Sequence, residues 1–264
     1  MIRRSILIMS LFFSGAALAS WIQVPISYAS TGAPESKGGA IIVELFTSEG
    51  CSSCPPADNL LQQISGKTTK DRRRIITLSE HVTYWNHLGW SDPFSNDVYT
   101  QRQEGYGRRF SLDSVYTPQM VIDGKEQLVG NDWKGLERLL NQEHERQSIR
   151  IRIIAVDRQG DDLLIAYSLI GSLPGTGADL MAVIVDDEDK SNVARGENSG
   201  RILTHVSVAR SIKRFQATAS SSDQQLKVPL LQSDSRLPKQ NRHLILFAQE
   251  KWQGRVLGAD DFPF

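Results

Sequence analysis

The chain has 264 residues, and its 30 lysine and arginine side chains balance its 30 aspartates and glutamates, so the formal net charge at pH 7 is zero. Hydrophobic residues make up 40% and charged residues 23% of the chain, which is typical of a globular protein of one or two domains and excludes collagen-like, low-complexity and disordered classes. The neutral balance argues against a nucleic-acid-binding protein, and two cysteines are too few for a disulfide scaffold.

The amino terminus has the layout of a secretory signal peptide. Residues 1–19 begin with a pair of arginines, continue through an apolar stretch and end in a small-x-small cleavage motif at Ala17–Leu18–Ala19. A second cleavage site after Ala29 and an uncleaved anchor are the alternatives. Residues 20–39 are rich in glycine and proline and predict a linker. We therefore expect a periplasmic or secreted protein with no membrane span after signal removal, in an oxidising compartment.

Residues 40–147 have the element order of a thioredoxin-like domain. A strand–helix–strand unit implies a right-handed parallel crossover, and a closing hairpin with a covering helix gives a mixed sheet with helices on both faces. The first four expected elements are a strand over 40–46, a helix over 57–66, a strand over 74–78 and a helix over 97–110. Strands over 119–122 and 127–129 follow, joined by a two-residue Asp123–Gly124 turn. The last element is a helix that is capped by Asn131 or Asp132 and runs to about Arg146, with Trp133, Leu136, Leu139 and Leu140 facing inward.

Residues 148–264 change to a series of short apolar runs separated by turn signals such as Gln159–Gly160–Asp161. Runs of this kind with no strong helix signal are typical of an all-β unit, most simply a sandwich. The sequence therefore predicts an α/β fold in which a thioredoxin-like domain is followed by an all-β sandwich-like unit.

Both cysteines fall between the first strand and the first helix, in the order Cys51–Ser–Ser–Cys54. The positive end of a helix dipole favours an anion there, so we expect Cys51 to be an exposed thiolate with a lowered pKa that acts as the nucleophile. Cys54 is close enough to attack the resulting mixed disulfide.

Two other interpretations of the cysteine pair stay open. One is a structural disulfide, although a bridge that closes so short a loop gains little from chain entropy. The other is half of a metal site: zinc would need two further ligands from the histidines, of which His81 and His87 form the only close pair, and copper would need one. We expect neither a metal nor a cofactor.

Other residues are candidates to serve the cysteine pair. Glu44 lies in the middle of the first apolar strand, where a carboxylate is costly, and its natural role is to accept the proton of Cys54. The alternative is a carboxylate paired with a nearby basic group. Glu49 is closer to Cys51, and its charge would oppose thiolate formation.

A turn before the third strand and two further segments are also candidate parts of a functional site. Thr117 and Pro118 begin that strand, and a cis proline there would place the Thr117 backbone beside the cysteines for an extended substrate. The aromatic insertion over 80–94 predicts either a wall of a binding groove or additional core. Residues 195–201 read as a loop within the second unit.

Four segments, ELFTSEGCSSCPPADNLL, HVTYWNHLGWSDPF, SVYTPQMVIDG and RGENSGRILTH, resemble the bacterial domain-of-unknown-function 1223 family of exported thioredoxin-like proteins. The resemblance runs from about Ile41 to the carboxyl end. It implies a thioredoxin-like domain with a β-rich extension, a redox pair at Cys51 and Cys54, and a cis proline at Pro118. By analogy with thioredoxin, Glu44 stands where a buried acid precedes the motif, although the connection here is one residue longer.

These observations favour a thiol-disulfide oxidoreductase whose partners are protein thiols, protein disulfides or a small thiol. In this interpretation Cys51 attacks, Cys54 resolves the mixed disulfide, and Thr117 with Pro118 aligns the partner. The alternatives are a non-catalytic binding module that keeps the thioredoxin fold and a copper-handling protein. The sequence does not distinguish an oxidant from a reductant or an isomerase, because that depends on a redox potential.

Overall fold

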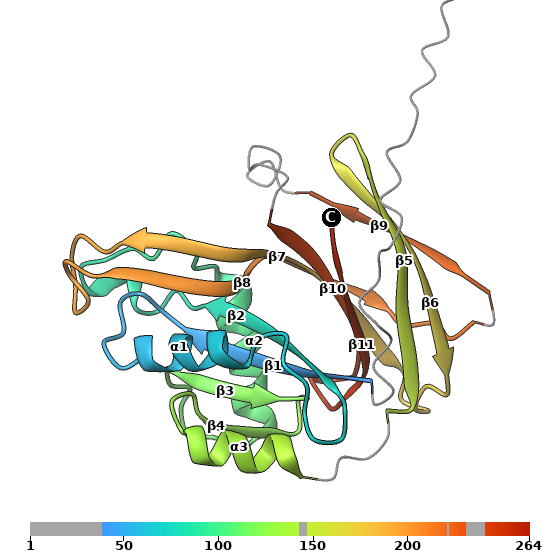
Figure 1. The fold of residues 1–264 in the computed structure, drawn as a ribbon, viewed down its shortest axis with the longest axis horizontal. Coiled ribbons are helices and arrows are strands. Elements are labelled where there is room, and N and C mark those ends of the chain that lie inside the picture. Colours follow the sequence, from blue (N-terminus) through green and yellow to red (C-terminus); the bar gives the residue numbers. More distant parts are fainter. Residues whose placement is uncertain (1–38, 143–146, 221, 231–240) are drawn as a thin grey trace, which may run out of the picture.

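The computed structural model describes residues 39–142, 147–220, 222–230 and 241–264. The predicted signal peptide, nearly all of the predicted linker and the predicted helix end at Arg146 lie outside these residues. The described chain forms two sheets, one of eight strands in the order β11-β10-β7-β8-β2-β1-β3-β4 and one of three in the order β5-β6-β9 (Figure 1). Within the described residues, no helix is long and apolar enough to cross a membrane.

The first half of the chain forms one end of the large sheet and three helices. β1 is parallel to β2 and antiparallel to β3, and β3 pairs with β4 in a hairpin. This is the mixed arrangement that the sequence predicts. The elements are β1 (Ala40–Thr47), α1 (Pro55–Ile64), β2 (Arg74–His81), a 3-10 turn (Asn86–Leu88), α2 (Asp97–Arg109), β3 (Gln119–Ile122), β4 (Glu126–Val129) and α3 (Trp133–Asn141).

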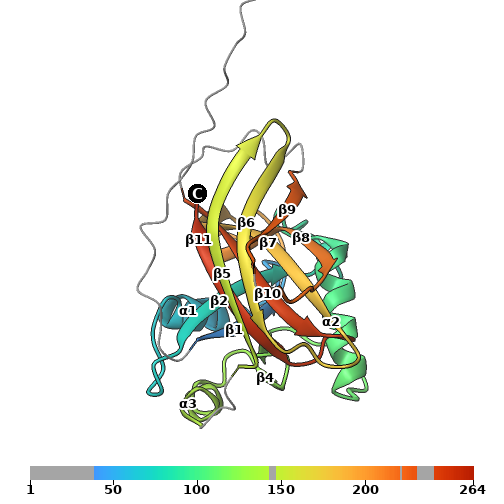
Figure 2. The same cartoon turned by 90° about the vertical axis from the view of Figure 1, so that its right-hand side faces the viewer.

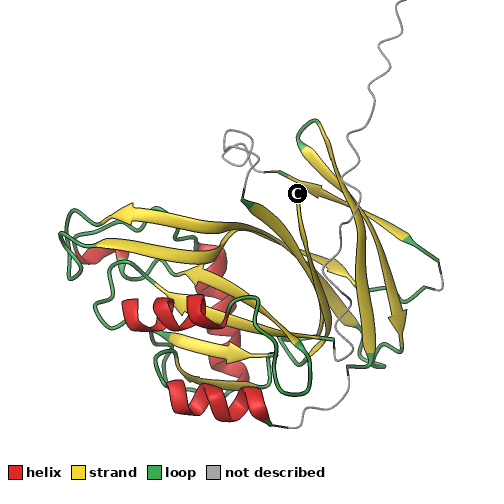
Figure 3. Cartoon of the chain, in the orientation of Figure 1, coloured by secondary structure: helices red, strands yellow, loops and turns green. Residues whose placement is uncertain are grey.

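The helices cover both faces of the sheet, as expected. Alternate residues of a strand point to opposite faces. Ile41, Val43 and Leu45 of β1 therefore pack with α1 and α3, while Ile42 and Phe46 lie on the other face, where Tyr99 and Tyr106 of α2 pack. Figure 3 shows α2 behind the sheet and the two shorter helices in front of it.

The second half is all β, and its strands form two packed layers. They are β5 (Ile149–Gln159), β6 (Asp162–Gly171), β7 (Ala178–Asn192), β8 (Ile202–Gln216), β9 (Gln224–Pro229), β10 (Arg242–Glu250) and β11 (Val256–Pro263). The small β5-β6-β9 sheet packs over β7, β10 and β11 through a buried apolar cluster that includes Ile165, Leu180 and Leu246. Figure 2 shows this small sheet lying across the large one. The sandwich-like prediction is therefore confirmed.

One layer of that sandwich is continuous with the first half of the chain. β8 lies parallel to β2, with Val208 opposite Ser79, so β7, β8, β10 and β11 extend the same sheet. Met181, Val183 and Phe247 of the second half share a core cluster with Ile42 and Leu78 of the first half and with Tyr99 of α2.

Three details of the elements differ from the sequence prediction. The β3–β4 turn has three residues, Asp123–Gly124–Lys125, since Ile122 pairs with Glu126, and Asp123 and Gly124 both have positive φ. Trp133 is 48% exposed and does not face inward. β11 was not predicted as a strand, because the glycine and paired aspartates within it interrupt its apolar pattern.

Candidate functional site

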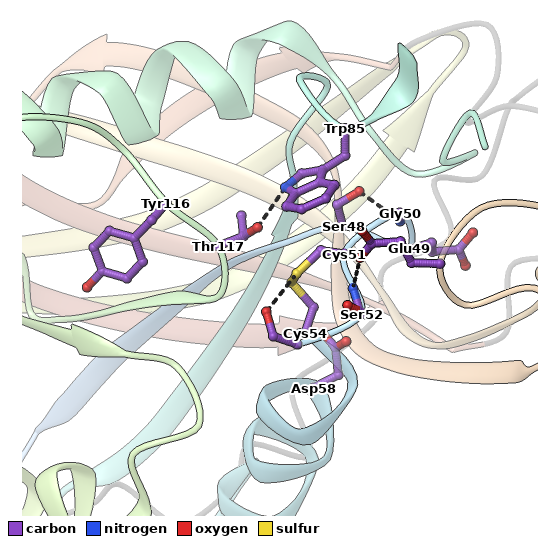
Figure 4. Close-up of a disulfide and its surroundings, with 12 residues drawn as sticks. Ser48, Glu49, Gly50, Cys51, Ser52, Cys54, Asp58, Trp85, Tyr116 and Thr117 are labelled. Atoms are coloured by element: carbon purple, nitrogen blue, oxygen red, sulfur yellow. Dashed lines mark hydrogen bonds between the residues drawn. A yellow bond between two sulfur atoms is a disulfide. The ribbon is translucent and has the colours of Figure 1, made fainter. Parts of the chain in front are cut away.

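Cys51 and Cys54 form a disulfide at the junction between β1 and α1 (Figure 4). Two reverse turns carry the chain from the strand to the helix: the Cys51 N–H donates to Ser48 O, and the Cys54 N–H donates to Cys51 O. Pro55 and Pro56 occupy the first helical positions, where a missing N–H costs nothing. The chain thus places the pair at the positive end of α1, as the sequence predicts.

Both cysteines are 0% exposed. The expectation of an exposed Cys51 sulfur is therefore wrong for this disulfide form. The intervening Ser52 and Ser53 are exposed, and the Ser53 hydroxyl lies 3.4 Å from Cys51 Sγ. The burial arises from segments that are remote in sequence and lie over the motif.

The loop between β7 and β8, residues 193–201, is one of these segments, and we call it the cover loop. The Asn198 side-chain amide donates to Glu49 O at 2.8 Å and to Cys51 O at 2.9 Å. Glu197 accepts a hydrogen bond of 3.0 Å from the Ser52 N–H. The Ser52 hydroxyl and N–H lower the pKa of the exposed Glu197 carboxyl. The sequence identified residues 195–201 as a loop but gave no sign that it contacts the cysteine motif.

The turn before β3 lies on another side of the disulfide. The Thr117–Pro118 peptide bond is cis, as expected. The Thr117 hydroxyl accepts a hydrogen bond of 2.7 Å from the Trp85 indole, and Figure 4 shows both side chains beside the two sulfurs. A Cβ added to Gly130 would lie 2.9 Å from Pro118 Cβ and 3.1 Å from Ala57 Cβ, so the proline is close to the first turn of α1.

The aromatic insertion contributes to the walls of the site. Trp85 packs over the motif, since its Cβ is 3.1 Å from where a Gly50 Cβ would be. Trp90 donates from its indole to Glu49 Oε2 at 2.7 Å. Tyr84 donates to Gln103 of α2 and packs with the Phe46 and Tyr106 cluster. The insertion therefore lies against the cysteine motif and adds to the core, and its role as the wall of a binding groove stays a prediction.

Glu44 is not brought to the cysteines. It lies on the α2 face of β1, whereas α1 covers the opposite face. Its carboxylate accepts hydrogen bonds from Arg102 Nε at 2.6 Å and from the Tyr106 hydroxyl at 2.5 Å. These contacts match the alternative interpretation, a buried carboxylate paired with a basic group.

A second carboxylate completes this buried group. Glu80 Oε1 lies 3.4 Å from Arg102 Nε. Burial and the neighbouring Glu44 raise the pKa of Glu80 well above its usual value, and one guanidinium serves both acids. Burial also raises the pKa of Tyr106.

A different set of buried acids lies under the motif, around His205 of β8. His205 Nε2 is 3.3 Å from Glu49 Oε1, and its Nδ1 is 3.7 Å from Asp58 Oδ1. Burial alone would lower the pKa of His205, but Asp58 and Glu49 raise it to about 10, so the ring is an imidazolium.

His81 and Asp92 extend this set. The two side chains are joined at 2.7 Å, and the His81 and His205 rings pack edge to face with centroids 4.6 Å apart. Burial alone would raise the pKa of Asp92, but His81 and the backbone N–H groups of Glu49 and Phe94 lower it.

Sequence reasoning missed the place of His205 and Asp58 in this site. The pairing of β8 with β2 brings this cation to the motif from far along the chain. Asp58 and His205 lie within two of the segments that resemble the family, but no spacing in the sequence links one residue to the other. Within the described residues, no group of three His, Cys, Asp or Glu side chains is arranged to hold a metal ion.

Residues 42–249 match the family described as "Protein of unknown function (DUF1223)", and the chain belongs to this family. A crystal structure of a protein from Agrobacterium tumefaciens is similar, with 25% identity and a TM-score of 0.60 over 87% of this chain and 96% of that one. A domain of the outer membrane lipoprotein Omp28 from Porphyromonas gingivalis aligns at 10% identity and a TM-score of 0.27 over 43% of this chain and 93% of that one. No protein of curated function matches the chain.

Proposed function

We propose that this member of the DUF1223 family is an exported thiol-disulfide oxidoreductase whose redox pair is Cys51 and Cys54. The observation that carries the proposal is the disulfide at the strand-to-helix junction, with the cis Thr117–Pro118 bond packed beside the start of α1. A disulfide that closes so short a loop contributes little stability, whereas two sulfurs at a helix amino terminus are well placed to exchange.

The reaction needs no cofactor. The Cys51 thiolate attacks one sulfur of a partner disulfide and forms a mixed disulfide, and the partner's other sulfur leaves as a thiolate that takes up a proton. Cys54 then loses its proton and attacks Cys51 Sγ, so the Cys51–Cys54 bond forms and the second partner sulfur leaves. Two electrons pass from the pair to the partner, and the reverse sequence oxidises a dithiol.

Access to the pair requires the cover loop to move. Asn198 and Glu197 fasten this loop to the motif through hydrogen bonds, two of which go to the backbone on either side of the first cysteine. When it leaves, the Ser52 N–H becomes free to donate to an extended partner segment, and the Cys51 carbonyl, which still accepts from the Cys54 N–H, loses its bond to Asn198. We propose that Thr117 offers its backbone to the same segment from the opposite side.

The proposed location is the periplasm or the cell exterior. An intramolecular disulfide persists in an oxidising compartment and is rare in the cytosol. The charged start, apolar stretch and cleavage motif of residues 1–19 support export.

Trapping tests the proposal. In the Cys54→Ser variant the mixed disulfide through Cys51 cannot be resolved, so it should accumulate with partner proteins or with a small thiol. The matched control, Cys51→Ser, should trap far less. If neither variant accumulates mixed disulfides during growth, and the purified protein does not exchange with glutathione, the proposal fails.

The burial of both sulfurs favours one second candidate, a non-catalytic binding module with a structural disulfide. In that case partner binding should survive replacement of both cysteines by serine, whereas the oxidoreductase loses its function.

A further inference from the structure

We propose that His205, supplied by the second half of the chain, is a positioning residue that promotes thiolate formation at Cys51 by neutralising Glu49 and Asp58. The inference rests on the proposed function, and it names the group that allows two buried acids to lie beside a nucleophilic sulfur.

The two acids flank the motif. Glu49 precedes Cys51 by two residues and is 0% exposed, and Asp58 follows Cys54 by one helical turn and is 5% exposed. Figure 4 shows Asp58 on the first turn of α1 close to the disulfide and Glu49 in the loop that leads into Cys51. Like charges close to a thiol disfavour its thiolate and raise its pKa, and burial strengthens this effect. Without a cation, these residues would therefore suppress the chemistry that the motif needs.

His205 is the group that contacts both acids. Its two ring nitrogens face the two carboxylates at 3.3 and 3.7 Å, and the residue is 1% exposed. Trp90 and Ser191 also donate to Glu49, at 2.7 and 3.2 Å, so this carboxylate is held in place. Their hydrogen bonds are neutral, whereas the imidazolium supplies a positive charge.

Other titratable groups face His205 from the elements around it. β2 contributes His81, whose ring contacts His205, and the segment after β2 contributes Asp92, which pairs with His81. β7 contributes Asp189, which pairs with His205 across the strands and interacts with it electrostatically. Arg210, on β8 itself, lies over the Phe94 ring that also contacts His205. Asp58 and Glu49, which contact the ring directly, raise the pKa of His205 to about 10.

The same hairpin holds the motif in a second way. The cover loop precedes β8, and its Asn198 binds the carbonyl oxygens of Glu49 and Cys51. The β7–β8 hairpin therefore fixes the backbone that leads into the motif and supplies the charge beneath it. A thioredoxin-like half without this hairpin would carry the cysteines and the two acids but not their counter-charge.

The test measures the pKa of Cys51 in reduced Cys54→Ser protein, from the ultraviolet absorbance of the thiolate as a function of pH. This readout requires neither a partner nor an open cover loop. His205→Gln should raise the pKa of Cys51 by about one unit, which is about a tenfold loss of thiolate near neutral pH. The matched control is His243→Gln, because His243 also pairs with an acid on a β strand but lies away from the motif.

A double variant separates a charge effect from a structural one. Glu49→Gln added to His205→Gln should bring the pKa of Cys51 back part of the way towards its original value, because one of the two acids left without their counter-charge is removed. A merely structural role for His205 predicts no such recovery. If His205→Gln does not fold, Glu49→Gln alone should lower the pKa of Cys51. An unchanged pKa in the folded variants overturns the inference, whereas failure of glutathione exchange in the wild-type protein overturns the proposed function.

Discussion

The side-chain amide of Asn198 donates to the carbonyl oxygens of Glu49 and Cys51 at 2.8 and 2.9 Å. One residue of the second half of the chain thus fastens the cover loop to the cysteine motif of the first half. Asn198 is itself 0% exposed, and Arg201 donates to its carbonyl oxygen at 2.9 Å. These hydrogen bonds hold the cover loop against a disulfide whose two cysteines are both 0% exposed.

Asn198→Ala should speed the reduction of the Cys51–Cys54 disulfide by a small thiol. The substitution removes two hydrogen bonds, worth about 1 kcal/mol each, so the cover loop should open roughly tenfold to thirtyfold more often. The measurement is the rate of reduction by dithiothreitol under native conditions. Ser199→Ala is the control, because Ser199 is exposed and bonds only within the same loop. Equal rates in the two variants would show that the loop does not limit access.

Glu44→Gln should leave the pKa of Cys54 unchanged, since Glu44 bonds to Arg102 and Tyr106 on the other face of the sheet. The pKa is measured by thiolate absorbance in the Cys51→Ser background, with circular dichroism to verify the fold. The comparison variant is Asp58→Asn, which removes an acid one helical turn from Cys54 and should lower this pKa. A clear shift with Glu44→Gln would restore the proton-acceptor role that the sequence suggests.

The raised pKa of His205 predicts a loss of stability in alkali. The folded protein holds the imidazolium proton up to a pKa of about 10, whereas the unfolded chain releases it near the ordinary value of 6.5. The protonated His205 ring therefore adds a few kcal/mol to the free energy of unfolding. This stabilisation is fully present below pH 6.5 and is lost as the pH rises through about 10.

Urea unfolding between pH 7 and pH 10 measures this loss. Burial raises the pKa of Asp123 to about 7, so the titration of Asp123 changes the free energy of unfolding mainly below this pH range. The decline in the free energy of unfolding should be shallower in His205→Gln than in the wild-type protein. Parallel curves for the two proteins would contradict the assignment of this charge.

Gly130→Ala should destabilise the protein by about 1–3 kcal/mol, because the added Cβ would lie 2.9 Å from Pro118 Cβ and from Leu45 Cδ1. The strain would fall where the cis proline meets α1, so glutathione exchange should slow as well. Gly175→Ala is the control, since a Cβ there meets nothing within 4 Å. Denaturant unfolding of both variants tests the close packing of this turn against the helix.

Local patterns in the sequence predicted most of the elements. The apolar run of β1, the cysteine spacing before α1 and the Thr117–Pro118 pair can each be recognised from a few neighbouring residues. The structure contains the corresponding strand, helix start and cis bond. β11 escaped because Gly258, Asp260 and Asp261 break its pattern. The structure explains all three residues. Asp260 binds Arg74 and the backbone N–H of Ile153, Asp261 also pairs with Arg74, and a Cβ on Gly258 would clash with the Ile149 carbonyl.

The parts of the site that come from distant segments could not be predicted in this way. His205 lies in a β strand, where a single histidine has no distinguishing spacing, and its position beside Asp58 depends on β8 pairing with β2. Asn198 is one polar residue in a polar loop. Glu44 is the converse case, an acid that is close to the motif in sequence but not in space. Side chains alternate along β1, so Glu44 points to the face that α2 covers, away from α1 and the cysteines.

The parallel join between β2 and β8 also constrains the order of events when the protein is made. β2 is synthesised early, but β8, its neighbour on one side, is synthesised only after the β5–β6 hairpin and β7. Until then β2 has one open edge and the apolar side chains of Ile42 and Leu78 lack part of their cover. We therefore expect a chain interrupted near residue 147 to aggregate, and the full chain to complete its fold only after its carboxyl-terminal strands have been made.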